Sequence, residues 1–163
     1  MNDRFKFRCY NKFQEKIFEV KNMSYIDGLV KRIEVQDDER ILIFDEWQKN
    51  IDNTVLMQCT GLKDKNGTLI YEGDILDKTK VDWKYEEYTL RYLVCWDRTQ
   101  WQLGLFKYQR PKAQNNRRYD RKIPFKNIVT FKDYTPFKEF AECEVIGNRY
   151  QNPELLEDTE CQK

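Results

Sequence analysis

The side chains that carry most enzyme chemistry are scarce in this sequence of 163 residues. It has no histidine, which removes imidazole acid–base catalysis, Ser-His-Asp and Cys-His nucleophiles, and histidine metal sites. The five cysteines, at positions 9, 59, 95, 143 and 161, include no close pair and no CxxC spacing of the zinc or redox kind. We therefore expect reduced thiols, most of them core residues, with no cofactor and no bound metal.

One group of carboxylates has a spacing compatible with metal chemistry. Glu72 and Asp74 lie two residues apart, so on a strand they would share a face. Together with Asp64 or Asp77 they could hold Mg²⁺ for a nuclease-like reaction. Acidic residues beside turns are more often caps or solvated ends, and the chain has no P-loop, GxGxxG motif or nucleophile elbow. We expect a non-enzymatic protein, with a metal-dependent nuclease as the least favoured alternative.

A strongly basic segment, residues 107–122, is a candidate nucleic-acid contact. The whole chain has 29 basic and 28 acidic residues, but this segment has seven basic residues and one acid, or +6. The remainder has 22 basic and 27 acidic residues, or −5. Its cations can neutralise phosphates and its tyrosines can stack on unpaired bases. The candidate residues are Lys107, Tyr108, Arg110, Lys112, Arg117, Arg118, Tyr119, Arg121 and Lys122. The alternative interpretation is a solvated loop, or one that folds against an acidic patch of a neighbouring subunit.

The aromatic residues suggest a protein-contact surface. There are 10 Phe, 10 Tyr and 4 Trp, a surplus that a small β domain does not fully bury. Trp83 stands among charged residues and is a candidate contact residue. Trp96 and Trp101 lie inside strand patterns, so we expect both in the core.

Alternation of apolar and polar residues predicts a mainly β or α+β protein with little helix. Near the N-terminus Phe5, Phe7 and Cys9 share one face of a predicted strand. All four prolines lie beyond residue 110, which disfavours long helices there. Residues 25–35 and 40–44 are together predicted to form two or three short strands. Further strands are predicted within 16–20, 55–60, 69–71, 74–76, 88–96, 101–106 and 142–148, and a short helix is predicted within 134–141.

Several turn residues are predicted to be architectural. Asn66-Gly67 favours a type I′ turn, which needs positive φ at both positions. Gly61, Gly73-Asp74 and Gly147-Asn148 are expected to supply backbone angles or kinks at strand ends. Asn152 before Pro153 predicts a helix start with Asn152 as its N-cap.

Three blocks of the sequence occur in a characteristic order. They are Lys6-Phe7-Arg8, then TGLKDKNG at 60–67 followed by IYEGDI at 70–75, and finally EVIGNRYQNPELL at 144–156. The second and third blocks resemble the central and closing motifs of the YopX family of bacteriophage and prophage proteins, and Lys6-Phe7-Arg8 resembles its opening block. That block usually continues as Trp-Asp, where this chain has Cys9-Tyr10-Asn11, and residues 107–122 match no motif of the family.

This resemblance implies a fold and a setting but no activity. It implies a small, β-rich, phage-encoded protein with an SH3-like barrel intertwined with a second α+β portion, and it allows a homo-oligomer. On this basis we divide the chain into an N-terminal β or α+β portion at 1–54, a barrel-like portion at 55–106, the basic segment at 107–122, and a return strand with a short helix at 123–163.

The function expected from these observations is non-enzymatic binding. We expect an accessory protein that contacts a host or phage protein, for regulation or counter-defence, with nucleic-acid binding through residues 107–122 as the alternative. The longest uncharged stretch, residues 53–62, has ten residues, too few for a membrane span. No secretory signal is recognised, so we expect the bacterial cytosol.

Overall fold

A computed structural model of the chain describes residues 3–46, 50–81, 87–97, 100–109, 121–122 and 140–156. The chain divides into two compact units, Met1–Cys59 and Thr60–Lys163, called unit 1 and unit 2 below. The described part is mostly antiparallel strand with short helical turns, which confirms the predicted mainly β fold. None of the helices in these residues is long and apolar enough to cross a membrane.

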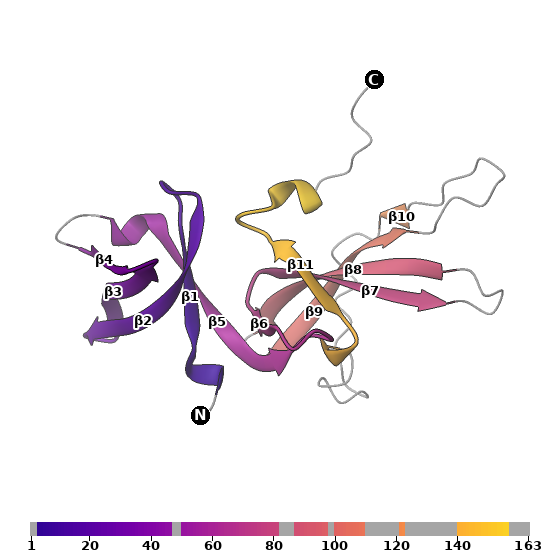
Figure 1. Ribbon diagram of the computed structural model, residues 1–163, viewed down its shortest axis with the longest axis horizontal. Coiled ribbons are helices and arrows are strands. Elements are labelled where there is room, and N and C mark those ends of the chain that lie inside the picture. The colour runs from indigo at the N-terminus through magenta and orange to yellow at the C-terminus, as the bar shows by residue number, and fades with distance from the viewer. Residues whose placement is uncertain are drawn as a thin grey trace, which may run out of the picture. The chain divides into compact units, whose positions relative to one another are not determined.

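Unit 1 consists of antiparallel strands that follow one another in the chain (Figure 1). Neighbouring strands from β1 to β4 pair by short hairpins, and β5 pairs with β1. The sheet has the order β4-β3-β2-β1-β5-β6, where β6 (Leu69–Tyr71) belongs to unit 2. β5 begins in unit 1 and its last residues belong to unit 2. The elements are η1 (Asp3–Phe5), β1 (Phe7–Asn11), β2 (Lys16–Ile26), β3 (Leu29–Asp37), β4 (Arg40–Asp45), η2 (Ile51–Asn53) and β5 (Thr54–Lys63).

The turn between β2 and β3 is a two-residue hairpin turn. Asp27 has φ 51° and Gly28 has φ 79°, and positive φ at both central positions is the property of a type I′ turn. Ile26 and Leu29 pair directly across it. The sequence-based prediction placed strands in this region but no turn at this Asp-Gly pair.

The core of unit 1 lies on the alternating inward face of its strands. Phe18 and Phe44 lie with ring centroids 6.0 Å apart, and burial raises the pKa of the Cys9 thiol to about 12. Phe5 was expected on the strand face of Cys9, but it lies in η1 before the strand begins and is 78% exposed. The buried residues of this core cluster are Cys9, Phe18, Ile33, Val35 and Phe44.

Unit 2 holds a second antiparallel sheet of order β10-β9-β8-β7-β11. β11, near the C-terminus, pairs with β7, so the closing segment of the chain returns to the middle of the sequence (Figure 1). The expected helix at 134–141 lies outside the described residues except for Phe140 and Ala141, which are helical. The remaining elements are β6 (Leu69–Tyr71), β7 (Asp74–Val81), β8 (Glu87–Asp97), β9 (Gln100–Gln109), β10 (Arg121–Lys122), β11 (Glu144–Asn148) and η3 (Pro153–Leu155).

The core of unit 2 ends before the tip of the β8–β9 hairpin. Tyr92 and Val94 of β8 are buried, whereas Trp96, on the same face, is 49% exposed. The prediction that Trp96 is a core residue was therefore wrong, because it stands one residue before the end of β8, beyond the last buried position of its face. The buried set is Ile70, Leu76, Tyr92, Val94, Leu103, Phe140 and Cys143.

Candidate functional site

Asp74, one of the carboxylates considered for metal binding, is a buried hydrogen-bond acceptor in unit 2. Its side chain is fully buried at the start of β7. Oδ2 accepts the backbone N–H of Tyr71 at 2.8 Å, and Oδ1 accepts the side-chain amide of Asn148 at 3.0 Å. The carboxylate thus joins the end of β6 to the end of β11, two segments that are distant in the sequence.

Asp64 closes the turn between β5 and β6. Oδ1 accepts the N–H groups of Asn66 and Thr68 at 2.9 and 2.8 Å, and Oδ2 accepts the N–H of Val145 at 3.0 Å. Burial raises the pKa of Asp64, but these hydrogen bonds lower it by more, so the net pKa lies below the ordinary value. Because the Asp64 carboxylate accepts three backbone N–H groups, its role is structural, and its oxygens are not free to coordinate a metal ion.

The predicted type I′ turn at Asn66-Gly67 was wrong. Gly67 has φ 85°, but Asn66 is not among the described residues with positive φ. The Gly67 N–H bonds to the Asp64 carbonyl at 3.0 Å, and the Asp64 side chain holds the Asn66 N–H. The side-chain acceptor therefore stabilises a different turn, in which only the glycine takes the left-handed conformation.

The other candidate metal ligands also lie apart from a common centre. Asp77 forms a two-bond pair with Arg91, with Nε–Oδ1 at 2.7 Å and Nη2–Oδ2 at 2.8 Å. Glu72 stands in the turn before β7, where burial raises its pKa and the charge of Arg149 partly offsets that effect. Within the described residues no group of three or more Cys, Asp or Glu side chains could hold a metal ion.

The glycines of the family-like motifs serve two different purposes. Gly61 and Gly73 have φ 79° and 78°, as the predicted backbone role requires. Gly147 has no such angle; a Cβ there would lie 2.7 Å from the Asn152 side-chain oxygen and 2.8 Å from a Leu155 methyl. Its requirement is close packing of β11 against the segment that follows, which cannot be recognised from a glycine in sequence alone.

Asn152 precedes a helical turn as predicted, with Pro153 at its first position. Asn152 is the N-cap residue, as predicted, but its side chain makes no capping hydrogen bond. Asn152 Oδ1 instead accepts the N–H of Asn148 at 3.2 Å, and Asn148 Oδ1 accepts the N–H of Tyr150 at 3.0 Å. Both asparagines therefore hold the chain reversal after β11.

The ends of the basic segment pair with each other in the second sheet. Lys107 and Tyr108 belong to β9 and Arg121 and Lys122 to β10, and the register places Lys122 opposite Lys107 and Arg121 opposite Tyr108. The other predicted contact residues lie outside the described residues: Trp83, Arg110, Lys112, Arg117, Arg118 and Tyr119.

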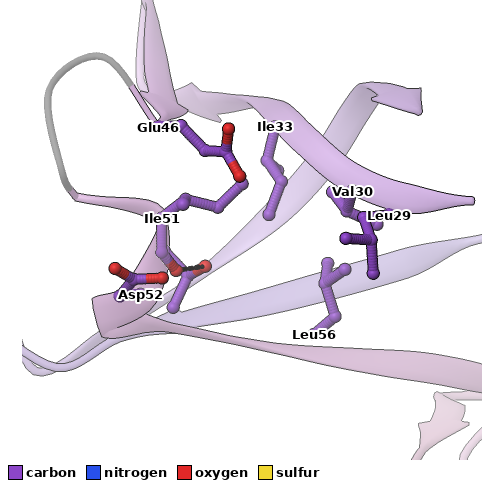
Figure 2. Close-up of a pocket in the computed structure, with 8 residues that line it drawn as sticks. Leu29, Val30, Ile33, Glu46, Ile51, Asp52 and Leu56 are labelled. Atoms are coloured by element: carbon purple, nitrogen blue, oxygen red, sulfur yellow. Dashed lines mark hydrogen bonds between the residues drawn. The ribbon is translucent and has the colours of Figure 1, made fainter. Parts of the chain in front are cut away.

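The described residues contain a pocket in unit 1 that the sequence did not indicate. It has a volume of about 390 Å³ and lies between β3 and β5, with η2 at one end (Figure 2). Figure 2 shows Val30 and Ile33 on one side, Leu56 opposite, and Ile51 at the η2 end. The turn of η2 is held by the Thr54 hydroxyl, which donates to the Ile51 carbonyl at 2.6 Å. The lining residues are Leu29, Val30, Ile33, Glu46, Ile51, Asp52, Thr54 and Leu56.

The tip of the β2–β3 hairpin exposes apolar side chains beside this pocket. Tyr25, Ile26 and Leu29 are 57%, 58% and 61% exposed, and Leu29 also lines the pocket. Of the eight large apolar side chains exposed in the described part of the chain, six lie in unit 1, and half of these are at this tip. Such clustering is typical of contact surfaces, whereas single exposed apolar residues are ordinary. We call Tyr25, Ile26 and Leu29 the hairpin tip.

The polar groups around the pocket are mostly acidic. Glu46 and Asp52 line it and are both exposed. Glu46 pairs with Lys31, whereas Asp52 forms no ion pair among the described residues. It is therefore an open pocket with mainly apolar walls and one carboxylate, Asp52, that forms no ion pair among the described residues.

Asn50 protects the strand next to the pocket. Its side-chain oxygen accepts the N–H of Asp45 at 2.7 Å, and its amide donates to the Ile43 carbonyl at 3.2 Å. These two groups lie on β4, the outer strand of the sheet, so the carboxamide occupies edge positions that another chain could otherwise pair with. We therefore regard the pocket and the hairpin tip, rather than this part of the β4 edge, as the candidate contact surface.

Comparison with known proteins identifies the family. The family model described as YopX protein matches residues 6–157, nearly the whole chain, and the chain belongs to this family. Among solved structures, it is similar to the crystal structure of protein EF1440 from Enterococcus faecalis, with 21% sequence identity and a TM-score of 0.60 over 93% of this chain and 97% of that chain. At this identity the likeness shows a shared fold. No curated protein matches the chain.

Proposed function

We propose that this chain is a non-catalytic, phage-encoded accessory protein that acts by binding a protein of its host or of the phage, in the cytosol of the bacterial cell. The observation that carries the proposal is the exposed hairpin tip beside the apolar pocket in unit 1. Apolar surface of this kind is stabilised when a partner covers it. The phage setting rests on membership in the YopX family.

The non-catalytic part of the proposal is supported by the structural hydrogen bonds and the ion pair that the carboxylates of unit 2 form. Asp64 and Asp74 accept backbone and side-chain hydrogen bonds, and Asp77 is paired with Arg91. Using any of them as a metal ligand would break contacts that hold unit 2 together. The alternative of a metal-dependent nuclease has no cluster in the described residues to support it.

The test is capture of a partner by the tagged full chain from the bacterial cells that produce it, with a tip variant and a matched control. We expect Leu29→Ser to reduce recovery of the partner at least tenfold. Phe13→Ser replaces an apolar residue that is even more exposed, in the turn at the opposite end of β2, and should leave recovery unchanged. Equal recovery by both variants, or no partner with either, would overturn the proposal.

A second candidate function is nucleic-acid binding through residues 107–122. The observation that favours it is the pairing of β9 with β10, which brings the two basic ends of this segment to neighbouring positions. Fluorescence titration with single-stranded and duplex oligonucleotides at two salt concentrations tests it, because phosphate contacts weaken steeply with salt.

The matched variants for that titration each remove three positive charges. Replacing Arg110, Arg117 and Arg118 by glutamine should weaken binding and flatten its salt dependence if the segment contacts phosphates. Replacing Lys12, Lys21 and Arg40 of unit 1 by glutamine should change both much less. Equal losses would assign the effect to net charge, and no binding at low salt would exclude this function.

A further inference from the structure

The walls of the unit 1 pocket are aliphatic. They come from three separate segments of the chain, the start of β3, the η2 turn and the first half of β5. A volume of about 390 Å³ is at the lower end of ligand pockets, enough for one long side chain with part of its neighbours. The wall residues are Leu29, Val30, Ile33, Ile51 and Leu56.

The charge at the η2 end of the pocket selects among side chains. Asp52 is exposed and has no cation beside it in the described residues, while Lys31, the nearby base, is already paired with Glu46. A purely aliphatic side chain would partly desolvate the Asp52 carboxylate without offering it a hydrogen bond or a positive charge in exchange. An acidic side chain would meet like charge.

The side chains that satisfy both features are arginine and lysine. Each has an apolar stem that packs on aliphatic walls and a cationic head that stays at the rim. With the stem against Ile33 and Leu56, the head would reach the η2 end of the pocket, where Asp52 is a lining residue. Arginine adds a planar fork that can pair with both oxygens of a carboxylate.

We propose that the unit 1 pocket recognises a segment of the partner protein in which an arginine or lysine is flanked by aliphatic residues, with Asp52 receiving the cation. This rests on the proposed function, because it specifies the chemistry of the partner that the hairpin tip contacts. The flanking aliphatic residues lie against Leu29 and Ile26 at the tip.

Three capped pentapeptides, Gly-Leu-Xaa-Leu-Gly with arginine, norleucine or glutamate at the centre, provide the test. Each is titrated into the full ¹⁵N-labelled chain, and amide shifts are followed at Ile33, Ile51 and Leu56. We expect the arginine peptide to bind about tenfold more tightly than the glutamate peptide, with norleucine between them. Equal affinities of the arginine and glutamate peptides, or no shifts with any peptide, would contradict the proposal.

The variant Asp52→Asn assigns the charge preference. We expect it to weaken the arginine peptide about three- to tenfold and to leave the norleucine peptide unchanged. Glu39→Gln, in the exposed β3–β4 turn, is the matched control and should change neither. An unchanged arginine preference in Asp52→Asn would contradict the assignment.

The two proposals fail in different ways. Tip-dependent capture of a partner without any arginine preference would retain the proposed function and remove the inference about the pocket. Arginine-selective shifts without tip-dependent capture would retain the pocket chemistry and remove the proposed function. The peptide experiment needs no knowledge of the partner, so its result does not depend on the capture experiment.

Discussion

The two units use their carboxylates in opposite ways. In unit 2, Asp64 and Asp74 are buried, and each accepts hydrogen bonds from segments that are distant in the sequence. In unit 1, Glu46 and Asp52 are exposed at the rim of an apolar pocket. A buried carboxylate must be fully partnered to be tolerated, so it is committed to the fold, whereas an exposed one can receive a ligand. The family motifs therefore mark architecture, and the candidate binding surface lies among residues that no motif includes.

Among substitutions that test this difference between the units, Asp74→Ala is expected to have the largest effect on the free energy of unfolding. The substitution leaves the Tyr71 N–H and the Asn148 amide buried without their acceptor, which should lower the free energy of unfolding by about 3–5 kcal/mol. Urea denaturation followed by circular dichroism measures this. Asp52→Ala is the control and should change the unfolding free energy by less than about 0.5 kcal/mol. A similar loss in both variants would mean that the units do not differ in this respect.

Gly147→Ala tests the close approach after β11. The added methyl meets the Asn152 side-chain oxygen and Leu155, so we expect a loss of about 1–3 kcal/mol from overpacking. Gly28→Ala in unit 1 meets no atom within 4 Å, and its cost should be limited to about 1 kcal/mol of strain from the positive φ. The same denaturation experiment ranks the two; a reversed order would show that the β11 reversal relaxes around the methyl.

Much of the fold could be predicted because strands follow from a local pattern. The alternation of apolar and polar residues predicted most of the strands, including the β8–β9 hairpin and the return strand β11. Turn type was less predictable because it depends on competing acceptors: the Asp64 side chain changes the turn at Asn66-Gly67, and the type I′ turn lies at Asp27-Gly28 instead. An Asp-Gly pair between apolar alternations was the available signal for that hairpin.

The candidate site was not predictable from the same patterns. Ile26 and Leu29 are of residue types that are usually buried in a core, and only the three-dimensional structure shows that both side chains are exposed. The pocket walls come from three segments whose proximity depends on long-range strand pairing. Trp96 illustrates the same limit, since an apolar residue in a strand pattern can lie beyond the end of the core.

Asn50→Ala removes a polar side chain of unit 1 that forms structural hydrogen bonds. The loss of hydrogen bonds to Asp45 and Ile43 should cost about 1–2 kcal/mol and expose the edge of β4. We expect greater self-association in sedimentation velocity at high protein concentration. Asn50→Asp can still accept the Asp45 N–H and should be intermediate; a variant as monodisperse as the parent would exclude an edge-protecting role.

Asp64 should make the stability of unit 2 sensitive to acid. Its pKa in the folded chain is below its ordinary value of 3.8, because the hydrogen bonds from Val145, Thr68 and Asn66 outweigh the effect of burial. The stabilisation is therefore fully present above about pH 4 and is lost as the pH falls through the folded-state pKa. Urea midpoints measured from pH 6 to 3 should fall more steeply in the parent than in Asp64→Asn. Parallel curves would mean that Asp64 does not contribute to the acid lability.

The smallest expected effect on stability, and the one that separates binding from folding, is that of Leu29→Ser. Leu29 is 61% exposed at the hairpin tip, so the free energy of unfolding should change by less than about 0.5 kcal/mol. The same substitution is expected to reduce partner recovery at least tenfold, because the lost apolar contact exists only in the complex. A loss of stability above about 1 kcal/mol would show that Leu29 supports the hairpin itself, and weaker binding would then follow from the fold rather than from a contact surface. A near-silent unfolding curve together with lost recovery is the combination that only a binding surface produces.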